Sequence, residues 1–314
     1  MPAGTAAPRS AARRIFRLAL GLALVLAIVL VVLQLFEAGR VFTVRSYVRG
    51  ERAWSLYFPV DSAKGLVARL DPLMTRVGLL RPVRVEVEPR VSLLLDPNDD
   101  VSRTILISRA SRWEPEVWDS ISSGLSNGAV FFDVGAHIGY DSLKASALVG
   151  EDGRVVAFEP NPNTLTALRS NIAASGARNV IVQPIACTDV ETTLTLFDST
   201  LGGNSGSSSL SEKNAGPVTR SYTVRGRPID DVVGELGLKR LDVLKADVEG
   251  AELLVLRGSA QTLRRFHPKL ILEVVPRQLA NMNTSVAELE AFLEDLGYNT
   301  MREVDYKNRE WTLR

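Results

Sequence analysis

Short apolar runs alternate with helix-like stretches from about residue 91 onward. Five such runs have the length of buried strands: residues 129–134, 154–159, 180–185, 241–246 and 270–275. Strands that are buried on both faces are nearly continuously hydrophobic, and strands that alternate with helices pair in parallel. The pattern therefore predicts a βαβ architecture built on a parallel sheet.

Polar residues at the ends of the intervening stretches predict where helices begin and end. Asn161 can cap a helix that follows the second strand, and Gly176 is suited to end it. Residues 250–263 have a helix-like pattern between the fourth and fifth strands. Ser285 and Glu288 form a capping box for a last helix, and we expect a closing pair of strands after it.

The N-terminal segment has a different pattern. Residues 15–36 are apolar except for Arg17 and Gln34, and a helix needs roughly 20 such residues to cross a bilayer. A helix at the surface of a core would show a polar face, which is missing here. A cleaved signal peptide would need small residues before the cut, where Phe36 is bulky. We therefore predict an uncleaved transmembrane helix.

This segment sets the expected domain organisation. We predict an N-terminal tail over residues 1–14, the membrane anchor over 15–36 and a catalytic domain over 89–314. Residues 37–88 carry no motif, and a membrane-proximal linker and a small subdomain both remain open. Arginines flank the anchor on both sides, so the positive-inside rule does not decide its orientation.

Composition narrows the classes of partner and chemistry. The chain has 37 basic and 36 acidic residues, so it lacks the basic footprint of a nucleic-acid-binding protein. Its single cysteine, Cys187, excludes an intramolecular disulfide and is expected to be a buried apolar residue. With two histidines besides, we expect no metal centre. No feature indicates an oligomeric state.

A glycine turn and an acidic residue form the candidate site. Gly135 and Gly139 follow the first strand and permit a tight turn that approaches a ligand closely, although such a turn alone also fits other α/β proteins. Glu159 ends the second strand, where a carboxylate can accept hydrogen bonds from ribose. A dinucleotide fingerprint would need glycines in place of His137 and Tyr140. A nucleoside cofactor without a pyrophosphate therefore fits better.

Four motifs in order resemble the FkbM-type methyltransferase family. They are DVGAHIGYDS (133–142), VVAFEPNP (155–162), KADVEGAELLVLRG (245–258) and PKLILEV (268–274). The resemblance implies a Rossmann-like, doubly wound, mostly parallel seven-stranded sheet with S-adenosylmethionine as cofactor. It also implies O-methylation of a sugar, glycolipid or polyketide-like acceptor.

The resemblance also implies which residues bind the cofactor: Asp133, Gly135, Ala136, His137, Gly139, Glu159 and Asp189. Asp133 and the two glycines would hold the methionine end, Glu159 the ribose, and Asp189 would lie near the adenine. The family's turn is expected to carry asparagine where this chain has His137, so the resemblance assigns that side chain no role.

Carboxylates after the fourth strand are the candidate catalytic groups. Asp247 or Glu249 would face the ligand crevice and could accept the proton of an acceptor hydroxyl. Alternatively, Asp247 orients the donor's amino group and Glu249 caps the next helix, or positioning alone suffices without a base. Glu114 and Glu273 are weaker candidates.

Three further expectations concern the surroundings of the site. The Gly/Ser-rich residues 201–210 form a loop, either a flap over the site or a surface loop. The methyl donor is a cytosolic metabolite, so we expect a single-pass membrane protein whose catalytic domain faces the cytosol. The alternative function is an inactive membrane-anchored nucleoside-binding or scaffolding protein of the same fold.

Overall fold

The computed structural model describes residues 40–42, 44–49, 74–76, 80–107, 113–199 and 205–313. The chain divides into two compact units, Met1–Val83 and Arg84–Arg314. In the described part of the first unit, residues 40–42, 44–49 and 74–76 are helical. Among the described residues, no helix is both long and apolar enough to cross a membrane. The anchor predicted over 15–36 lies outside those residues.

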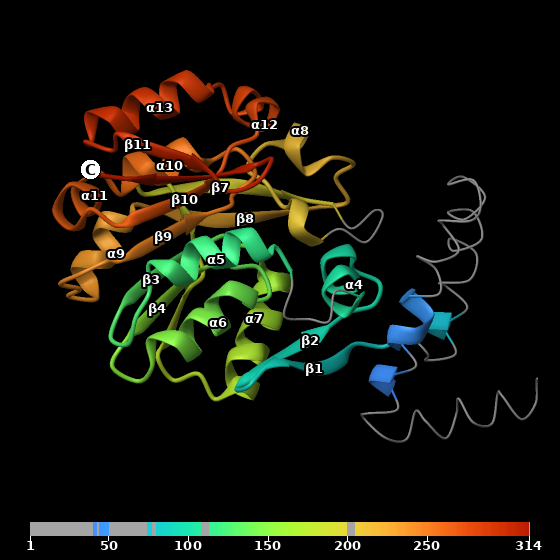
Figure 1. Ribbon diagram of the computed structural model, residues 1–314. Helices are drawn as coiled ribbons and strands as arrows, with labels where there is room; N and C mark the ends of the chain where they lie inside the picture. Colours follow the sequence, from blue (N-terminus) through green and yellow to red (C-terminus); the bar gives the residue numbers. More distant parts are fainter. Residues whose placement is uncertain are drawn as a thin grey trace, which may run out of the picture. The chain divides into compact units, whose positions relative to one another are not determined.

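A seven-stranded sheet forms the centre of the second unit (Figure 1). Its strands, in spatial order, are β11 (Thr300–Glu303), β12 (Asn308–Thr312), β10 (Lys269–Glu273), β9 (Val243–Ala246), β3 (Val130–Val134), β4 (Arg154–Phe158) and β5 (Val180–Gln183). Strands β10, β9, β3, β4 and β5 pair in parallel, whereas β12 is antiparallel to both β10 and β11. The mostly parallel sheet and the closing strand pair are confirmed.

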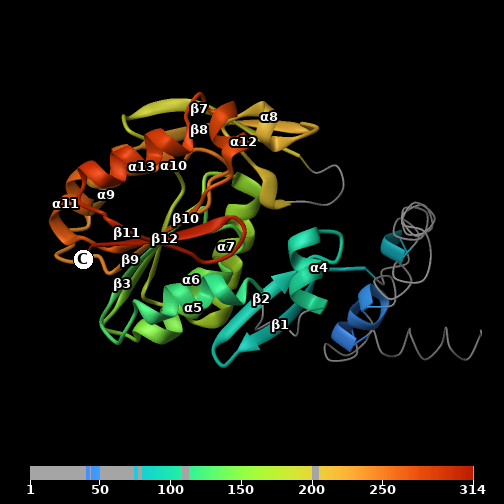
Figure 2. The ribbon, with the colours of Figure 1, turned by 45° about the horizontal axis from the view of Figure 1, so that its top comes forward.

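Helices cover both faces of this sheet (Figures 1 and 2). One face carries α5 (Pro115–Ser123), α6 (Tyr140–Val149) and α7 (Pro162–Ser175). The other carries α9 (Ile229–Glu235), α10 (Glu252–Gly258), α11 (Ala260–Phe266), α12 (Pro276–Asn281) and α13 (Val286–Asp295). The chain runs outward from β3 through β4 and β5 and then returns to β9 on the other side. The sheet is therefore doubly wound, with its switch point between β3 and β9.

Alternating side chains of the strands fill two separate cores. Phe132 packs with the helices from α9 to α13, whereas Phe131 packs with α5 and α6. Asp133 follows the same alternation as Phe131 and therefore faces α6. Lys245 is the Cα partner of Asp133 on β9 and shares that face. The sheet register thus places two charged side chains together inside a layer that is otherwise apolar.

The helix ends follow the predicted caps. The Asn161 side chain accepts a hydrogen bond from the Asn163 amide at 3.0 Å, and Gly176 ends α7 with φ of 64°. The Ser285 side chain caps α13 by accepting from the Glu288 amide at 3.2 Å. The predicted helix over 250–263 is instead α10 and α11. They are separated at Ser259, whose hydroxyl donates to the Val255 carbonyl at 2.8 Å.

Two small sheets were not predicted from the sequence. A hairpin of β1 (Val83–Glu88) and β2 (Val91–Leu95) precedes α4 (Asp100–Ile107), and the domain boundary expected at 89 falls in its turn. Lys144 of α6 is buried, forms an ion pair with Glu88 at 2.9 Å and lies 4.2 Å from the Trp118 ring centroid. This contact joins the hairpin to the domain.

The second small sheet lies in the segment between β5 and β9. It has the order β6 (Ala186–Cys187), β8 (Arg220–Arg227) and β7 (Thr192–Asp198). The chain from β7 to β8 contains a 3-10 turn (Ser205–Ser207) and α8 (Glu212–Ala215). This segment supplies part of the wall of the cleft described next.

Candidate active site

A cleft opens at the carboxyl ends of β3, β4 and β9, at the switch point of the sheet. Its open volume, including the part that meets solvent, is about 640 Å³. The predicted site residues Gly135, His137, Glu159, Asp247 and Glu249 all line it. The structure thus brings together motifs that lie more than a hundred residues apart in the sequence.

The glycine turn is held against its neighbours by backbone contacts. The amides of Gly135 and Ala136 donate to the Phe158 carbonyl at 3.1 and 3.0 Å. Gly135 has φ of 84°, and a Cβ at this position would lie 1.9 Å from the Asp247 carbonyl oxygen. Only glycine therefore allows the turns after β3 and β9 to approach this closely.

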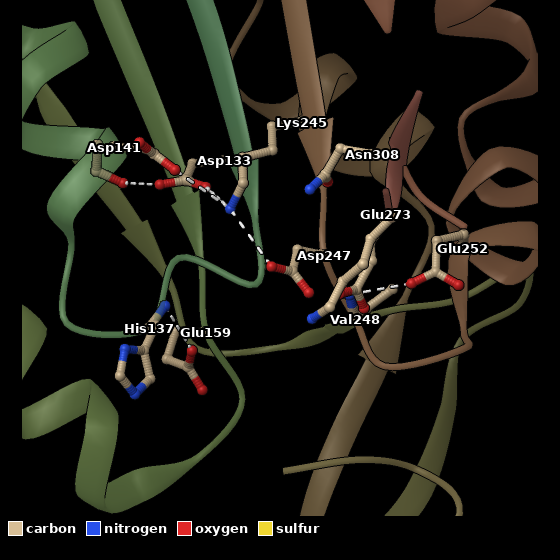
Figure 3. Close-up of polar contacts among 12 residues, drawn as sticks. Asp133, His137, Asp141, Glu159, Lys245, Asp247, Val248, Glu252, Glu273 and Asn308 are labelled. Atoms are coloured by element: carbon tan, nitrogen blue, oxygen red, sulfur yellow. Dashed lines mark hydrogen bonds and ion pairs between the residues drawn. The ribbon is translucent and has the colours of Figure 1, made fainter. Parts of the chain in front are cut away.

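Glu159 connects the glycine turn to the end of β4. Its Oε2 accepts from the His137 amide at 2.9 Å and its Oε1 from the Asn161 amide at 2.8 Å (Figure 3). Burial raises the pKa of Glu159 to about 7, although both amide hydrogen bonds oppose this shift. An ionised carboxylate has about four acceptor positions, so two remain for ribose hydroxyls.

The backbone at His137 explains the departure from the expected asparagine. His137 has φ of 51°, a left-handed conformation in which asparagine and histidine are both enriched. Because its amide is the group that bonds Glu159, either residue can hold the turn in this form.

Asp133 belongs to a buried charge network and does not open into the cleft. Its Oδ2 accepts from the Ser142 hydroxyl at 2.6 Å, and its Oδ1 lies 3.8 Å from Lys245 Nζ (Figure 3). Lys245 Nζ also lies 3.3 Å from Asp141 and 3.9 Å from Asp247. Burial alone would lower the pKa of Lys245, but these carboxylates raise it well above its ordinary value. Lys245 therefore stays charged and fixes the carboxylates around it.

The loop after β9 presents Asp247 and Glu249 toward the cleft. The carboxylate of Glu252 accepts from the amides of Val248 and Gly250, each at 3.2 Å. These amides belong to the loop before α10, so Glu252 holds that loop. The N-cap of α10 is Ala251, and no side chain makes a capping hydrogen bond there, so Glu249 does not cap this helix. Glu249 has a positive φ of 53°, a costly conformation for this residue that contacts around it must hold. One of these is a hydrogen bond from Gln278 Nε2 to its carboxylate.

The weaker candidates Glu114 and Glu273 interact electrostatically with the residues around Asp247. Burial raises the pKa of Glu249 to about 8 and that of Glu273 to about 7, and Asp247 adds to both shifts. Burial likewise raises the pKa of Glu114 to about 7. The charge of Lys245 opposes this shift, and the charge of Asp247 adds to it. Glu114 and Glu273, the weaker candidates, therefore belong to the same electrostatic environment.

Part of the wall of the cleft is apolar. Ile185, Ala186, Cys187 and Leu196 line it, whereas the Asp189 side chain is exposed and lies outside the lining. The expected place of Asp189 near the adenine therefore stays a prediction. The chain leaves the cleft after Cys187 to enter the small sheet. Cys187 is buried as expected, and burial raises the pKa of its thiol.

The Gly/Ser-rich loop contributes to the same wall. Among its described residues, Gly206, Ser208, Ser209 and Leu210 line the cleft. Ser208 accepts from Asn161 Nδ2 at 2.8 Å and donates to Asp198 at 3.0 Å, and Ser209 donates to the Glu249 carbonyl at 3.0 Å. The described part of the loop therefore lines the cleft, and its role as a mobile flap stays a prediction.

Comparisons with known proteins agree with this geometry. A sequence profile described as the methyltransferase FkbM domain matches residues 133–300, more than half of the chain. Methyltransferase sdnD of Sordaria araneosa is 29% identical over 210 residues, covering 58% of this chain and 78% of that protein. The AMB antimetabolite synthetase AmbE of Pseudomonas aeruginosa is 31% identical over 191 residues, covering 51% of this chain but 9% of AmbE.

Among solved structures, the methyltransferase FkbM from Methylobacillus flagellatus is similar with a TM-score of 0.41. It is 17% identical, with 68% of this chain and 55% of that chain covered. The profile match includes the glycine turn, Glu159 and the loop after β9, which the fold brings into one cleft. The chain belongs to the FkbM methyltransferase family, and its cofactor is S-adenosylmethionine.

Proposed function

We propose that this chain transfers a methyl group from S-adenosylmethionine to a hydroxyl oxygen of a sugar, glycolipid or polyketide-like acceptor. The observation that carries the proposal is the position of Asp247 and Glu249. Both residues line the same cleft as Gly135, and the backbone carbonyl of Asp247 lies directly against that glycine. An acceptor hydroxyl approaching the donor from this side would meet them first.

Different residues of the cleft match the different parts of S-adenosylmethionine. The apolar lining of Ile185, Ala186 and Cys187 suits the adenine, and Glu159 offers acceptors to the ribose hydroxyls. The methionine end would lie against the turn at Gly135, which only a glycine can hold this close to the Asp247 carbonyl. S-adenosylmethionine supplies an electrophilic methyl group when it is bound.

Asp247 and Glu249 orient the acceptor in this proposal. A carboxylate that accepts the hydrogen bond of a hydroxyl turns the oxygen lone pair toward the methyl carbon. The new O–C bond forms as the C–S bond breaks, and the hydroxyl proton passes to one of the two carboxylates. Alignment of this kind contributes even where base strength does not.

Labelled methyl transfer tests this proposal. Full-length protein would be incubated with methyl-labelled S-adenosylmethionine and with glycolipid, polysaccharide or polyketide acceptors, and the product analysed by NMR. We expect the label on oxygen. The variants Asp247→Asn and Glu249→Gln should each turn over at least about 10²-fold more slowly than the wild type and should still bind the donor. Label on nitrogen or carbon, or on an added RNA alone, would contradict the proposal.

The membrane anchor is a separate part of the proposed function. The charge-free apolar core of residues 18–33 supports an uncleaved helix, and the cytosolic origin of the donor supports a catalytic domain on that side. A reporter fused after Arg314 should be active in the cytosol. Activity restricted to the opposite side of the membrane would overturn this orientation, and a fully soluble full-length protein would overturn the anchor.

A further inference from the structure

Three carboxylates converge at the ends of β9 and β10, beside the donor cleft. One oxygen from each of Asp247, Glu249 and Glu273 lies within 4.8 Å of the others. Figure 3 shows the carboxylates of Asp247 and Glu273 turned toward each other. We infer that these three side chains bind a hard divalent cation such as Mg²⁺, which would hold the acceptor oxygen. The inference rests on the proposed function and specifies how its carboxylates act.

One carboxylate oxygen of Glu273 is buried without a hydrogen-bond partner among the described residues. Its side chain is 4% exposed, and its Oε1 accepts from Lys307 Nζ at 2.9 Å. Its Oε2 is fully buried and has no hydrogen-bond partner among the described residues. A buried carboxylate oxygen without a donor is costly. A cation between the three carboxylates would remove that cost.

The surrounding charges leave the cluster negative. Lys307 is paired with Glu273, and Lys245 is shared between Asp247 and the two buried carboxylates of Asp133 and Asp141. Buried Glu252 adds to the negative potential around Glu249 and also has an oxygen, Oε2, without a partner in the described part of the chain. The local excess of carboxylates over lysines favours a cation over an anion.

The oxygen donors and their spacing fit a hard cation. Mg²⁺ takes six oxygen ligands at 2.0–2.1 Å and Ca²⁺ takes more at 2.3–2.6 Å, so opposite ligands lie about 4 to 5 Å apart. Asp247 and Glu249 are half-buried and can rotate to adjust this distance. The cluster contains no histidine or cysteine, which disfavours zinc.

Such a cation would bind the acceptor oxygen and favour acceptors of a particular kind. Three protein ligands leave about three positions of an octahedral ion for water and acceptor oxygens. Coordination lowers the pKa of a bound hydroxyl. With Asp247 and Glu249 bound to the cation, the hydroxyl proton would leave to solvent and not to these carboxylates, and the oxygen would bond to the methyl carbon as the C–S bond breaks. An acceptor with two adjacent oxygens, such as a sugar diol, would occupy two positions and bind better than a lone hydroxyl.

Binding of Mn²⁺, observed by electron paramagnetic resonance, tests the site without any acceptor. Full-length protein would be titrated with Mn²⁺, with and without S-adenosylhomocysteine, and then with competing Mg²⁺. We expect one Mn²⁺ per chain, displaced by Mg²⁺ and retained beside S-adenosylhomocysteine. Glu273→Gln and the half-buried Glu249→Gln should each weaken binding by about tenfold or more. Glu235→Gln, which alters an exposed ion pair with Arg227, should leave it unchanged.

The remaining outcomes contradict the inference. Wild-type protein that binds S-adenosylhomocysteine but no Mn²⁺ at millimolar concentration would overturn the cation site and leave the proposed function standing. Mn²⁺ binding that survives both substitutions would place the ion elsewhere. Exclusion of Mn²⁺ by S-adenosylhomocysteine would show that the cluster instead holds the amino group of the donor. Wild-type protein without donor binding would instead contradict the proposed function.

Discussion

Substitution of Gly135 by alanine tests how the donor cleft is built. The added Cβ would lie 1.9 Å from the Asp247 carbonyl oxygen, whereas ordinary contacts begin near 3.4 Å. The turns after β3 and β9 must therefore separate by about 1.5 Å, and both contacted atoms belong to backbone. Because both turns line the cleft, this movement enlarges the donor site where the methionine end binds.

The chain offers a matched control. Gly128 has φ of 79°, close to the 84° of Gly135, but a Cβ there would meet no described atom within 4 Å. Alanine at either position costs about 1–2 kcal/mol of stability because of the left-handed backbone. Only Gly135→Ala should in addition disturb the cleft. The difference between the two variants isolates the close approach of the turns from the cost of the backbone conformation.

Calorimetric titration with S-adenosylhomocysteine and urea unfolding would measure the two effects separately. We expect Gly128→Ala to lose stability with unchanged affinity. Gly135→Ala should bind at least tenfold more weakly, which is about 1.4 kcal/mol, and a displacement of this size should cost about 10²-fold in turnover. Equal affinities in two folded variants would refute this view of the glycine turn.

Three further predictions concern single residues. Burial raises the pKa of Glu159 to about 7, and Asp133 and Asp198 add to the shift. The ribose hydroxyls donate hydrogen bonds to the ionised form of this carboxyl group. Donor affinity should therefore rise between pH 6 and 8 by calorimetry, and Glu159→Gln should bind weakly without this dependence. Lys245→Met should lower unfolding free energy by about 3–5 kcal/mol in urea, because buried carboxylates lose their cation; an unchanged midpoint would contradict the network. Ser285→Ala should cost about 1 kcal/mol through the lost cap of α13 and leave donor affinity unaltered.

Much of the fold was readable from the sequence because its signals are local. The central strands β3, β4, β9 and β10 are almost entirely buried and have apolar sequences. The caps at Asn161 and Ser285 lie where their side chains predict. The small sheet was missed because β7 and β8 are short of buried residues, so their alternation is weak. The break at Ser259 was missed because serine also occurs within helices.

The candidate site was predicted in part. The glycine turn and Glu159 could be found because their spacing matches a nucleoside site, and the cleft contains both. The place of Asp189 near the adenine rested on the family resemblance, and its side chain is exposed beyond the strand that contains Cys187.

The role of Lys245 depends on strand register, which the sequence does not specify. Its pairing with Asp133 follows from β9 lying beside β3. A lysine within an apolar strand run was nevertheless a usable signal, because buried lysines are almost always paired. The convergence of Glu273 with Asp247 likewise follows from the pairing of β9 with β10.

Calorimetric titration of the full-length protein with S-adenosylmethionine and S-adenosylhomocysteine tests the central claim most directly. The geometry of Gly135, Glu159 and the apolar wall predicts binding of both ligands at one site per chain. It also predicts that Glu159→Ala, which removes the ribose acceptor, weakens both. Folded wild-type protein that binds neither ligand would contradict the assignment of this cleft as a methyl-donor site.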